Sequence, residues 1–298
     1  MNKTAETIGF IGVGLMGHGI AKNILIAGYA VYVLAHRNRA PVEDLLSKGA
    51  QEVKSLADMA RNTTVIYVCA PGSPEVEAIV AELLPELHPG TVIIDCSTSD
   101  PNSTMRLAMR LAEHDCHMAD APLGGTPVQA ESGELSTMIG ATDAIFARIQ
   151  PVVETWARSI VHMGNNGAGH KMKLLNNFLS LGYAAMYSEA LALAEKVGIT
   201  TAQFDSVIRG SRMDCGFYQT FMGYALEGNR EAHKFTLTNA LKDTNYLAKM
   251  ADGVHLANPI GGAVKNSFAL AFAAGGDGPE DYVPHLVDYV MVQNGVNK

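Results

Sequence analysis

The chain has 298 residues, a length that indicates two domains rather than one. Apolar residues make up 48% and charged residues 17%, so the chain can build packed cores and is not intrinsically disordered. The 22 basic residues against 30 acidic residues give a net charge of −8, which disfavours nucleic-acid and membrane partners because both need a broad basic face.

Up to about residue 164, short runs of β-type residues alternate with amphipathic helical stretches, including 75–87 and 102–113. Asp100-Pro101 introduces the second of these helices with a cap and a proline at the first helical position. This alternation predicts a parallel sheet with crossover helices, a doubly wound α/β domain. The expected strands are Thr7–Ile11, Ala30–Ala35, Thr64–Cys69, Thr91–Asp95, His117–Ala121, Thr137–Gly140 and Ile160–Met163.

A glycine motif, Gly12-x-Gly14-x-x-Gly17, follows the first strand and opens a helix. In this context G-x-G-x-x-G is typical of dinucleotide binding: the first glycine allows a tight turn, the second lets the backbone approach the pyrophosphate, and the third lets the helix pack closely. The pyrophosphate would meet the helix N-terminus. We expect Gly12, Gly14, Leu15, Met16 and Gly17 to bind the cofactor, with a purely structural turn as the alternative.

The end of the second strand bears on the choice between NAD and NADP. An acid about 20 residues after the motif would accept hydrogen bonds from the ribose hydroxyls of NAD, but no acid lies between Glu6 and Glu43. The segment His36-Arg37-Asn38-Arg39 instead offers cations and donors for a 2′-phosphate. We expect NADPH/NADP, bound by His36, Arg37 and Asn38, although a solvated basic turn would have the same composition.

Small residues follow the next two strands, in Cys69-Ala70-Pro71-Gly72-Ser73 and in Asp95-Cys96-Ser97-Thr98. Open α/β sheets bind their ligands at the carboxyl ends of the strands. We expect Ala70, Pro71 and Thr98 to contact the cofactor and Ser97 the substrate. Turn and helix-cap chemistry explains these residues equally well.

Beyond Gly169 the β-type pattern ends and helical periodicity takes over. The predicted fold is therefore an N-terminal Rossmann-type domain at residues 1–165 followed by an all-helical domain at residues 166–298, with a hinge at 164–169. The first helix is apolar on almost every side from Leu174 to Leu193, so we expect it to be buried within the domain or against another subunit. The expected helices span residues 171–196, 201–210, 235–251, 259–274 and 281–293.

The cysteines indicate a reducing compartment. A chain of this length folds without disulfides, so separated cysteines read as reduced thiols in a cytoplasmic protein. The apolar start is broken by glycines and followed by His18 and Lys22, which indicates mature structure rather than a signal peptide. The cysteines, none of them in a C-x-x-C pair, are Cys69, Cys96, Cys116 and Cys215.

Four blocks of the sequence occur in an order typical of one enzyme family. They are Gly9–Gly17, Asp120–Thr126 with Gly133–Leu135, Gly167–Asn177, and Lys242-Asp243. In these blocks the chain resembles the β-hydroxyacid dehydrogenase family, which includes 3-hydroxyisobutyrate dehydrogenase and tartronate semialdehyde reductase. The resemblance spans almost the whole chain and implies an NAD(P)-dependent oxidoreductase that acts on a CH–OH group.

The third block resembles the family pattern G-x-G-x-x-x-K-x-x-x-N, which implies that Lys173 is catalytic and that Asn177 orients the substrate. The spacing of i to i+4 places both on one helix face, away from Lys171. Carbonyl reduction by hydride needs a proton donor at the developing alkoxide, which a positioned lysine can supply. The resemblance also implies that Lys242 reaches the cofactor and substrate pocket, with a paired helix-surface lysine as the alternative.

The second block departs from the family's usual D-A-P-V-S-G-G, whose serine and backbone amides hold the substrate carboxylate. Gly124 replaces the serine, Thr126 supplies a hydroxyl two positions later, and Gln129 replaces a customary glycine. A subgroup with G-R-T here handles sulfonated aldehydes, but Gly125 stands in place of that arginine. Successive glycine amides still predict an anion nest for a carboxylate, or for a sulfonate or phosphonate. The residues expected to hold the substrate are Pro122, Leu123, Gly124, Gly125, Thr126 and Ser97.

The sequence thus predicts an NADPH-dependent reductase/dehydrogenase that interconverts a small anionic aldehyde or ketone and its hydroxy acid, with a lysine as general acid/base. Imine reduction is disfavoured because Lys173 is present, and a non-catalytic NADPH-binding sensor is the alternative from another class. We expect no metal, because hydride chemistry requires none. The family resemblance, together with the apolar first helix of the helical domain, predicts a homo-oligomer, a dimer or a tetramer.

Overall fold

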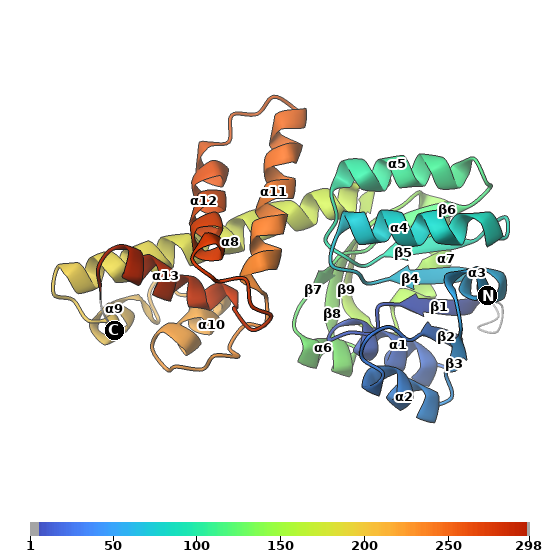
Figure 1. Ribbon diagram of the computed structural model, residues 1–298, viewed down its shortest axis with the longest axis horizontal. Coiled ribbons are helices and arrows are strands. Elements are labelled where there is room, and N and C mark those ends of the chain that lie inside the picture. The colour runs from blue at the N-terminus through green and yellow to red at the C-terminus, as the bar shows by residue number, and fades with distance from the viewer. Residues whose placement is uncertain (1–5, 297–298) are drawn as a thin grey trace. The chain divides into compact units, whose positions relative to one another are not determined.

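The computed structural model describes residues 6–296 and divides the chain into two compact units. One unit ends at Lys173 and the other begins at Leu174. The first holds a sheet with helices on both faces, and the second is built from helices (Figure 1). This architecture confirms the predicted fold class. The boundary expected between residues 165 and 166 lies in the turn before α8 (Ala168–Lys196). The division between the two units falls a few residues later, within the first part of that helix.

Within residues 6–296 the sheet has nine strands in the order β3-β2-β1-β4-β5-β6-β8-β7, and β9 also pairs with β8. Neighbouring strands from β3 to β6 are parallel, whereas β8 runs antiparallel to β6 and β7. The strands are β1 (Thr7–Ile11), β2 (Ala30–Leu34), β3 (Gln51–Val53), β4 (Val65–Val68), β5 (Val92–Asp95), β6 (His117–Asp120), β7 (Leu123–Gly124), β8 (Leu135–Gly140) and β9 (Ala157–Gly164).

Each predicted β-type run forms a strand, but β3 and β7 were not predicted. They are too short to show alternation, since β3 has three residues and β7 has two. The expected helix at 75–87 divides into α4 and a 3-10 turn, because Pro85 cannot continue the hydrogen-bond ladder. The helices of this unit are α1 (Gly17–Ile26), α2 (Ala40–Ser47), α3 (Leu56–Asn62), α4 (Ser73–Leu83), η1 (Leu84–Glu86), α5 (Pro101–Ala112), α6 (Pro127–Ser132) and α7 (Asp143–Val153).

The central strands are buried on both faces, which is why they read as unbroken apolar runs. On one face, Tyr67 stacks on Phe10 at 5.6 Å between ring centroids and meets the edge of Trp156 at 6.2 Å. On the other face, Ile66 and Ile93 join a second apolar cluster. These two cores hold the sheet rigid, so the loops at its carboxyl edge are built on a fixed support.

The second unit contains most of α8 and five further α-helices within the described residues. Helix α10 was not predicted, because its aromatic residues have modest helix propensity, yet Tyr218, Phe221 and Met222 recur at helical spacing and are buried. No helix in residues 6–296 is both long and apolar enough to cross a membrane. The helices are α8 (Ala168–Lys196), α9 (Thr201–Ile208), α10 (Gly216–Ala225), α11 (Leu237–Gly253), α12 (Pro259–Ala273), η2 (Val283–His285) and α13 (Leu286–Gln293).

Helix α8 is only partly covered by its own chain. Leu181 and Leu191 are buried in the core of the second unit. Leu179, Met186 and Leu193 are 58%, 57% and 64% exposed. The expectation of a buried helix therefore holds for one side of α8, and the other side presents apolar side chains that this chain does not enclose.

The first turn of α8 lies against the sheet of the first unit. A Cβ atom on Gly169 would stand 2.2 Å from the carbonyl oxygen of Met138 on β8. The carboxylate of Asp120 accepts hydrogen bonds from the amide N–H groups of Gly167 at 2.7 Å and His170 at 2.8 Å. Glycine at position 169 thus permits a close approach of helix and strand that no larger residue allows.

We predict that Gly169→Ala destabilises the protein, because its methyl group would overlap the Met138 carbonyl and force the helix start to move. Overpacking of this kind costs about 1–3 kcal/mol and should lower the melting temperature by several degrees in a thermal scan. Gly182→Ala, in the same helix, is the matched control. Its nearest neighbour would be Val264 at 3.8 Å, so it should leave the melting temperature unchanged or raise it. Equal melting temperatures for the two variants would contradict the prediction.

Candidate active site

The glycine motif forms the turn expected between β1 and α1. Gly12 has φ +95°, and a Cβ atom there would lie 2.1 Å from the carbonyl oxygen of Cys69. A Cβ atom on Gly17 would lie 2.1 Å from the carbonyl oxygen of Gly12, whereas one on Gly14 would meet nothing within 4 Å. The first and third glycines are therefore required by internal packing, and the second borders open space where a ligand can approach the backbone.

The start of α1 is suited to an anion. Its N-cap, Met16, makes no side-chain capping bond, and the first turn has no acidic residue. The unpaired amides and the dipole at such a helix start favour a negative charge. Leu15, which precedes the cap, is 65% exposed. Gly12, Gly14, Leu15, Met16 and Gly17 thus fit a pyrophosphate group.

In the basic segment after β2, some side chains form contacts within the chain and others are exposed to solvent. The Arg39 guanidinium forms a two-bond pair with Glu52, at 3.0 and 3.1 Å, so it belongs to an internal ion pair rather than to a phosphate site. The Asn38 side chain accepts a hydrogen bond from the amide of Ala40 at 3.2 Å. Arg37 is exposed, like His36, and forms no ion pair within residues 6–296. Arg37 is therefore the cation of this segment that can reach a ligand.

The ends of β4 and β5 are joined by hydrogen bonds. The amide N–H of Ala70 donates to the Ser97 hydroxyl at 2.9 Å, and the amide N–H of Ser97 donates to Asp95 at 2.8 Å. Ser97 is 4% exposed. Ser97 thus takes part in the turns at this edge, and its expected contact with the substrate stays a prediction. Pro71 and the half-buried Thr98 lie at the same carboxyl edge of the sheet.

A break between β6 and β7 produces the turn at residues 122–126. Pro122 has no N–H to donate to a neighbouring strand, and its carbonyl oxygen accepts from the Thr137 hydroxyl at 3.1 Å. Gly125 has φ +125°, a conformation that side chains rarely adopt. Thr126 caps α6 in a capping box, where its amide donates to the Gln129 side chain at 2.9 Å. Gln129 therefore completes the cap of α6.

A buried polar cluster lies beneath the start of α8. Asp120 and His170 are both 0% exposed. The Nε2 atom of His170 donates to the Ser97 carbonyl at 3.1 Å, since a carbonyl can only accept, and Nδ1 lies 2.8 Å from the Thr104 hydroxyl. Burial raises the pKa of Asp120, although the nearby His170 and the amides of Gly167 and His170 oppose the shift. Both residues lie in the family blocks, but nothing in the sequence indicated that they contact each other.

Lys173 and Asn177 lie one turn apart on α8, as the sequence predicted from their spacing. Lys173 is half-buried and Asn177 is 5% exposed. The Nδ2 atom of Asn177 donates to Oδ2 of Asp243 at 2.7 Å. The orientation of the Asn177 amide is therefore fixed by a carboxylate on α11.

Asp243 also forms an ion pair with Lys242, the lysine of the fourth family block. Its side chain is 2% exposed, and its Oδ1 atom lies 3.2 Å from Nζ of Lys242. The Lys242 ammonium also lies 5.5 Å from the centre of the Tyr246 ring. Asp243 is the organising residue that sequence reasoning missed, although it belongs to the fourth family block. The sequence feature that could have identified Asp243 is its position next to Lys242.

The thiols at this edge of the sheet are unreactive. Burial raises the pKa of the Cys69 thiol to about 12 and holds the pKa of Cys96 well above its usual range. All four cysteines are free, and a neutral buried thiol is a poor nucleophile. Within residues 6–296, no three His, Cys, Asp or Glu side chains form a set that could hold a metal ion.

Two family models match the chain. Residues 7–164 match the NAD binding domain of 6-phosphogluconate dehydrogenase. Residues 167–285 match a model described as NAD-binding of NADP-dependent 3-hydroxyisobutyrate dehydrogenase. Together with the glycine turn and the helical unit, these matches define the class as a dehydrogenase with an N-terminal NAD(P)-binding domain.

Curated relatives identify the family. A 3-hydroxyisobutyrate dehydrogenase of Pseudomonas aeruginosa is 32% identical over 272 residues, which cover 88% of this chain and 91% of the relative. A 3-sulfolactaldehyde reductase of Escherichia coli (strain K12) is 27% identical over 292 residues, which cover 97% of each. The chain belongs to the β-hydroxyacid dehydrogenase family. It is an oxidoreductase of the β-hydroxyacid type, acting on CH–OH groups.

Solved structures share the fold. The structure of Mycobacterium tuberculosis 3-hydroxyisobutyrate dehydrogenase with L-serine has a TM-score of 0.84 and 24% sequence identity. The match covers 95% of this chain and 98% of that one. At this identity the match shows that the two proteins share both the sheet domain and the helical domain.

Proposed function

We propose that the protein is an NADPH-dependent reductase/dehydrogenase that interconverts a small anionic aldehyde or ketone and its hydroxy acid. The observation that carries this proposal is the helix α8, which presents Lys173 just beyond its anchored first turn and Asn177 one turn later. Lys173 is the general acid/base, and Asn177 orients the reacting oxygen. The four free thiols support a cytoplasmic location.

Each side chain has a separate role in the reaction. The nicotinamide, when bound, supplies or accepts the hydride. Lys173 gives a proton to the carbonyl oxygen during reduction and removes the hydroxyl proton during oxidation. Asn177 hydrogen-bonds the same oxygen, and Asp243 keeps the Asn177 amide in one orientation. Lys242, held by Asp243, contributes positive charge for the cofactor or the substrate.

The names of two relatives and the turn at residues 122–126 support the proposed substrate class. Two relatives, 3-hydroxyisobutyrate dehydrogenase and 3-sulfolactaldehyde reductase, are named for acidic substrates. At position 125, a side chain would be strained by φ +125° and would meet Gln129 at 2.9 Å. An arginine is therefore disfavoured here, and we propose a carboxylate as the head group ahead of a sulfonate or a phosphonate.

A panel of substrates tests the proposal. Cofactor absorbance is followed with NADPH and succinic semialdehyde, 3-sulfolactaldehyde or phosphonoacetaldehyde, and with NADP⁺ and 3-hydroxyisobutyrate or L-serine. Substrate-dependent turnover that is fastest for a carboxylate compound is the expected result. Cofactor binding without turnover of any compound would instead indicate a nucleotide sensor.

Lys173→Ala is predicted to lower kcat by roughly 100-fold or more, because a general acid contributes about 10² to 10⁴ to the rate. NADPH affinity should be nearly unchanged. Lys171→Ala is the matched control, since Lys171 is an exposed lysine on the same helix. Steady-state kinetics of the two variants decide the assignment, and turnover within a few-fold of wild type for Lys173→Ala would reject it.

Arg37→Ala is predicted to raise the KM for NADPH roughly 10-fold or more, because it removes a hydrogen bond to a charged group worth about 1.5–3 kcal/mol. The KM for NADH should scarcely change. Arg39→Ala is the control, because Arg39 already pairs with Glu52. Equal kinetic constants for NADPH and NADH in the wild-type enzyme would show that the preference does not exist.

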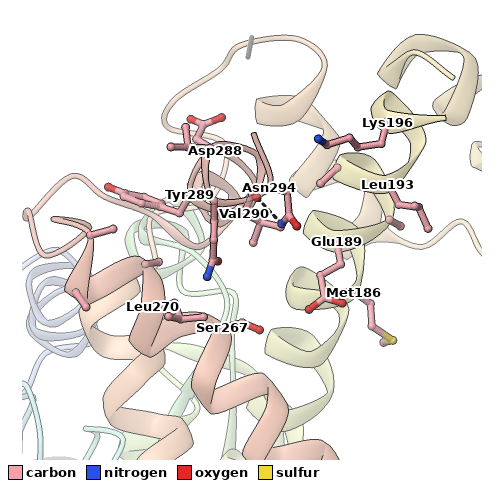
Figure 2. Close-up of a pocket in the computed structure, with 17 residues that line it drawn as sticks. Met186, Glu189, Leu193, Lys196, Ser267, Leu270, Asp288, Tyr289, Val290 and Asn294 are labelled. Atoms are coloured by element: carbon pink, nitrogen blue, oxygen red, sulfur yellow. Dashed lines mark hydrogen bonds between the residues drawn. The ribbon is translucent and has the colours of Figure 1, made fainter. Parts of the chain in front are cut away.

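We also propose that the protein is a homo-oligomer. A groove of about 1400 Å³ lies between α8, α12 and α13 in the second unit. Figure 2 shows Met186 and Leu193 on one side of it and Leu270 and Tyr289 on the other. Leu193 is 64% exposed and Leu270 is 50% exposed, so a partner surface that covered them would remove apolar area from water. A second copy of the chain is the proposed occupant.

Light scattering should therefore give a mass of at least a dimer at micromolar concentration, with an interface of about 2,000 Å² or more. Leu193→Glu should weaken the assembly, because it places a charge in the apolar groove. Ile26→Glu is the control, since Ile26 is 70% exposed but lies in the first unit. A monomer for the wild-type protein would reject the proposal.

A further inference from the structure

One of the two arginines in the segment after β2 is held by a carboxylate on the neighbouring strand. The Arg39 guanidinium donates from both terminal nitrogens to the two carboxylate oxygens of Glu52, at 3.0 and 3.1 Å. Its Nε atom also lies 3.4 Å from Oε1 of Glu43 on α2. Two parallel hydrogen bonds fix a guanidinium more firmly than a single surface contact does. Arg39 is therefore directed toward β3.

The position of Glu52 in the sheet explains how it reaches this arginine. In the parallel register of β2 and β3, Glu52 lies beside Val33, one residue before the carboxyl end of both strands. Val53 is buried in the core, whereas Glu52 keeps 32% of its side chain exposed. Packing of the core thus requires Val53 but does not require a carboxylate at position 52. The Arg39 guanidinium holds the pKa of Glu52 below its ordinary value, so the carboxylate is charged at neutral pH.

The charges of the basic segment and of its partners cancel while this ion pair is closed. Arg37 and Arg39 supply two positive charges, and Glu43 and Glu52 supply two negative charges. A phosphate monoester such as the 2′-phosphate of NADPH carries a charge of about −1.5 to −2 at pH 7. Two guanidinium groups can bind one phosphate, since each offers paired N–H donors to its oxygens. Arg37 is exposed, so Arg39 is the arginine whose availability depends on a carboxylate of the chain.

We propose that Glu52 is a specificity-determining residue for the cofactor, because it holds Arg39 away from the 2′-phosphate and leaves Arg37 to bind that group alone. The Glu52 carboxylate therefore limits the preference for NADPH over NADH. This determinant lies on β3, outside the segment after β2 that the sequence pattern indicates. The inference rests on the proposed function, in which NADPH is the cofactor.

The test measures cofactor binding alone, so it requires no turnover. The Kd values of NADPH and NADH are determined from nicotinamide fluorescence for the full wild-type chain and for Glu52→Gln, which keeps the length of the side chain and removes its charge. Glu52→Gln should lower the Kd for NADPH by about 5-fold or more, because the released Arg39 can form charge-assisted hydrogen bonds to the phosphate. The Kd for NADH should scarcely change, since NADH lacks the 2′-phosphate. Arg39→Ala alone should leave both Kd values unchanged.

The double variant Glu52→Gln/Arg39→Ala separates the release of Arg39 from the simple loss of a negative charge. In the Arg39→Ala background, Glu52→Gln should no longer lower the Kd for NADPH, because no second guanidinium is left to release. A purely electrostatic effect of the lost charge would instead lower the Kd equally in both backgrounds. The matched control is Glu86→Gln, which removes an exposed carboxylate paired with Arg61 at 2.8 Å in the same unit and should change neither Kd.

Three results would overturn the inference: an unchanged NADPH Kd in Glu52→Gln, an equal gain in the Arg39→Ala background, or weaker NADPH binding by Arg39→Ala alone. Failure of the proposed function gives a different pattern. If the wild-type protein binds NADPH and NADH equally but Glu52→Gln gains NADPH affinity only when Arg39 is present, this inference stands and the proposed NADPH preference fails. If Arg37→Ala weakens NADPH binding and Glu52→Gln changes nothing, the proposed preference stands and this inference fails.

Discussion

One buried carboxylate fixes the helix on which the proposed chemistry depends. Asp120, at the end of β6, accepts hydrogen bonds from the amides of Gly167 and His170 at the start of α8. A helix start leaves its first amides without partners, and a negative charge there is favoured by the helix dipole. Because His170 and Lys173 lie within one turn of the same helix, the carboxylate that holds the first also sets the position of the second.

A second buried carboxylate plays a comparable part further along the same helix. Asp243 binds the Asn177 amide through one oxygen and the Lys242 ammonium through the other. In both places a buried carboxylate, to which we assign no part in the proposed reaction, holds neighbouring polar groups in position. Within residues 6–296, Oδ2 of Asp243 accepts the hydrogen bond from Asn177, whereas Oδ1 accepts none and forms only the ion pair with Lys242. The Asn177 amide is thus oriented before a ligand binds.

Local patterns in the sequence were sufficient for the architecture and for the residues that share a helix. The alternation of β-type and helical runs predicted the sheet because periodicity records which face of each element is buried. The glycine motif predicted the turn before α1, since its residues act within one segment. Lys173 and Asn177 were placed on one face of α8 because spacing within a helix fixes direction. Strands as short as β3 and β7 carry no period and were missed.

Only the tertiary structure decided which distant residues meet. Arg39 pairs with Glu52, so the basic segment offers Arg37 rather than both arginines. Ser136 stands opposite Gly124 in the antiparallel pairing of β7 and β8. Asp243 reaches Asn177 from another helix. Contacts between segments far apart in the chain depend on how strands and helices are placed in space, and that placement leaves no periodic trace in the sequence.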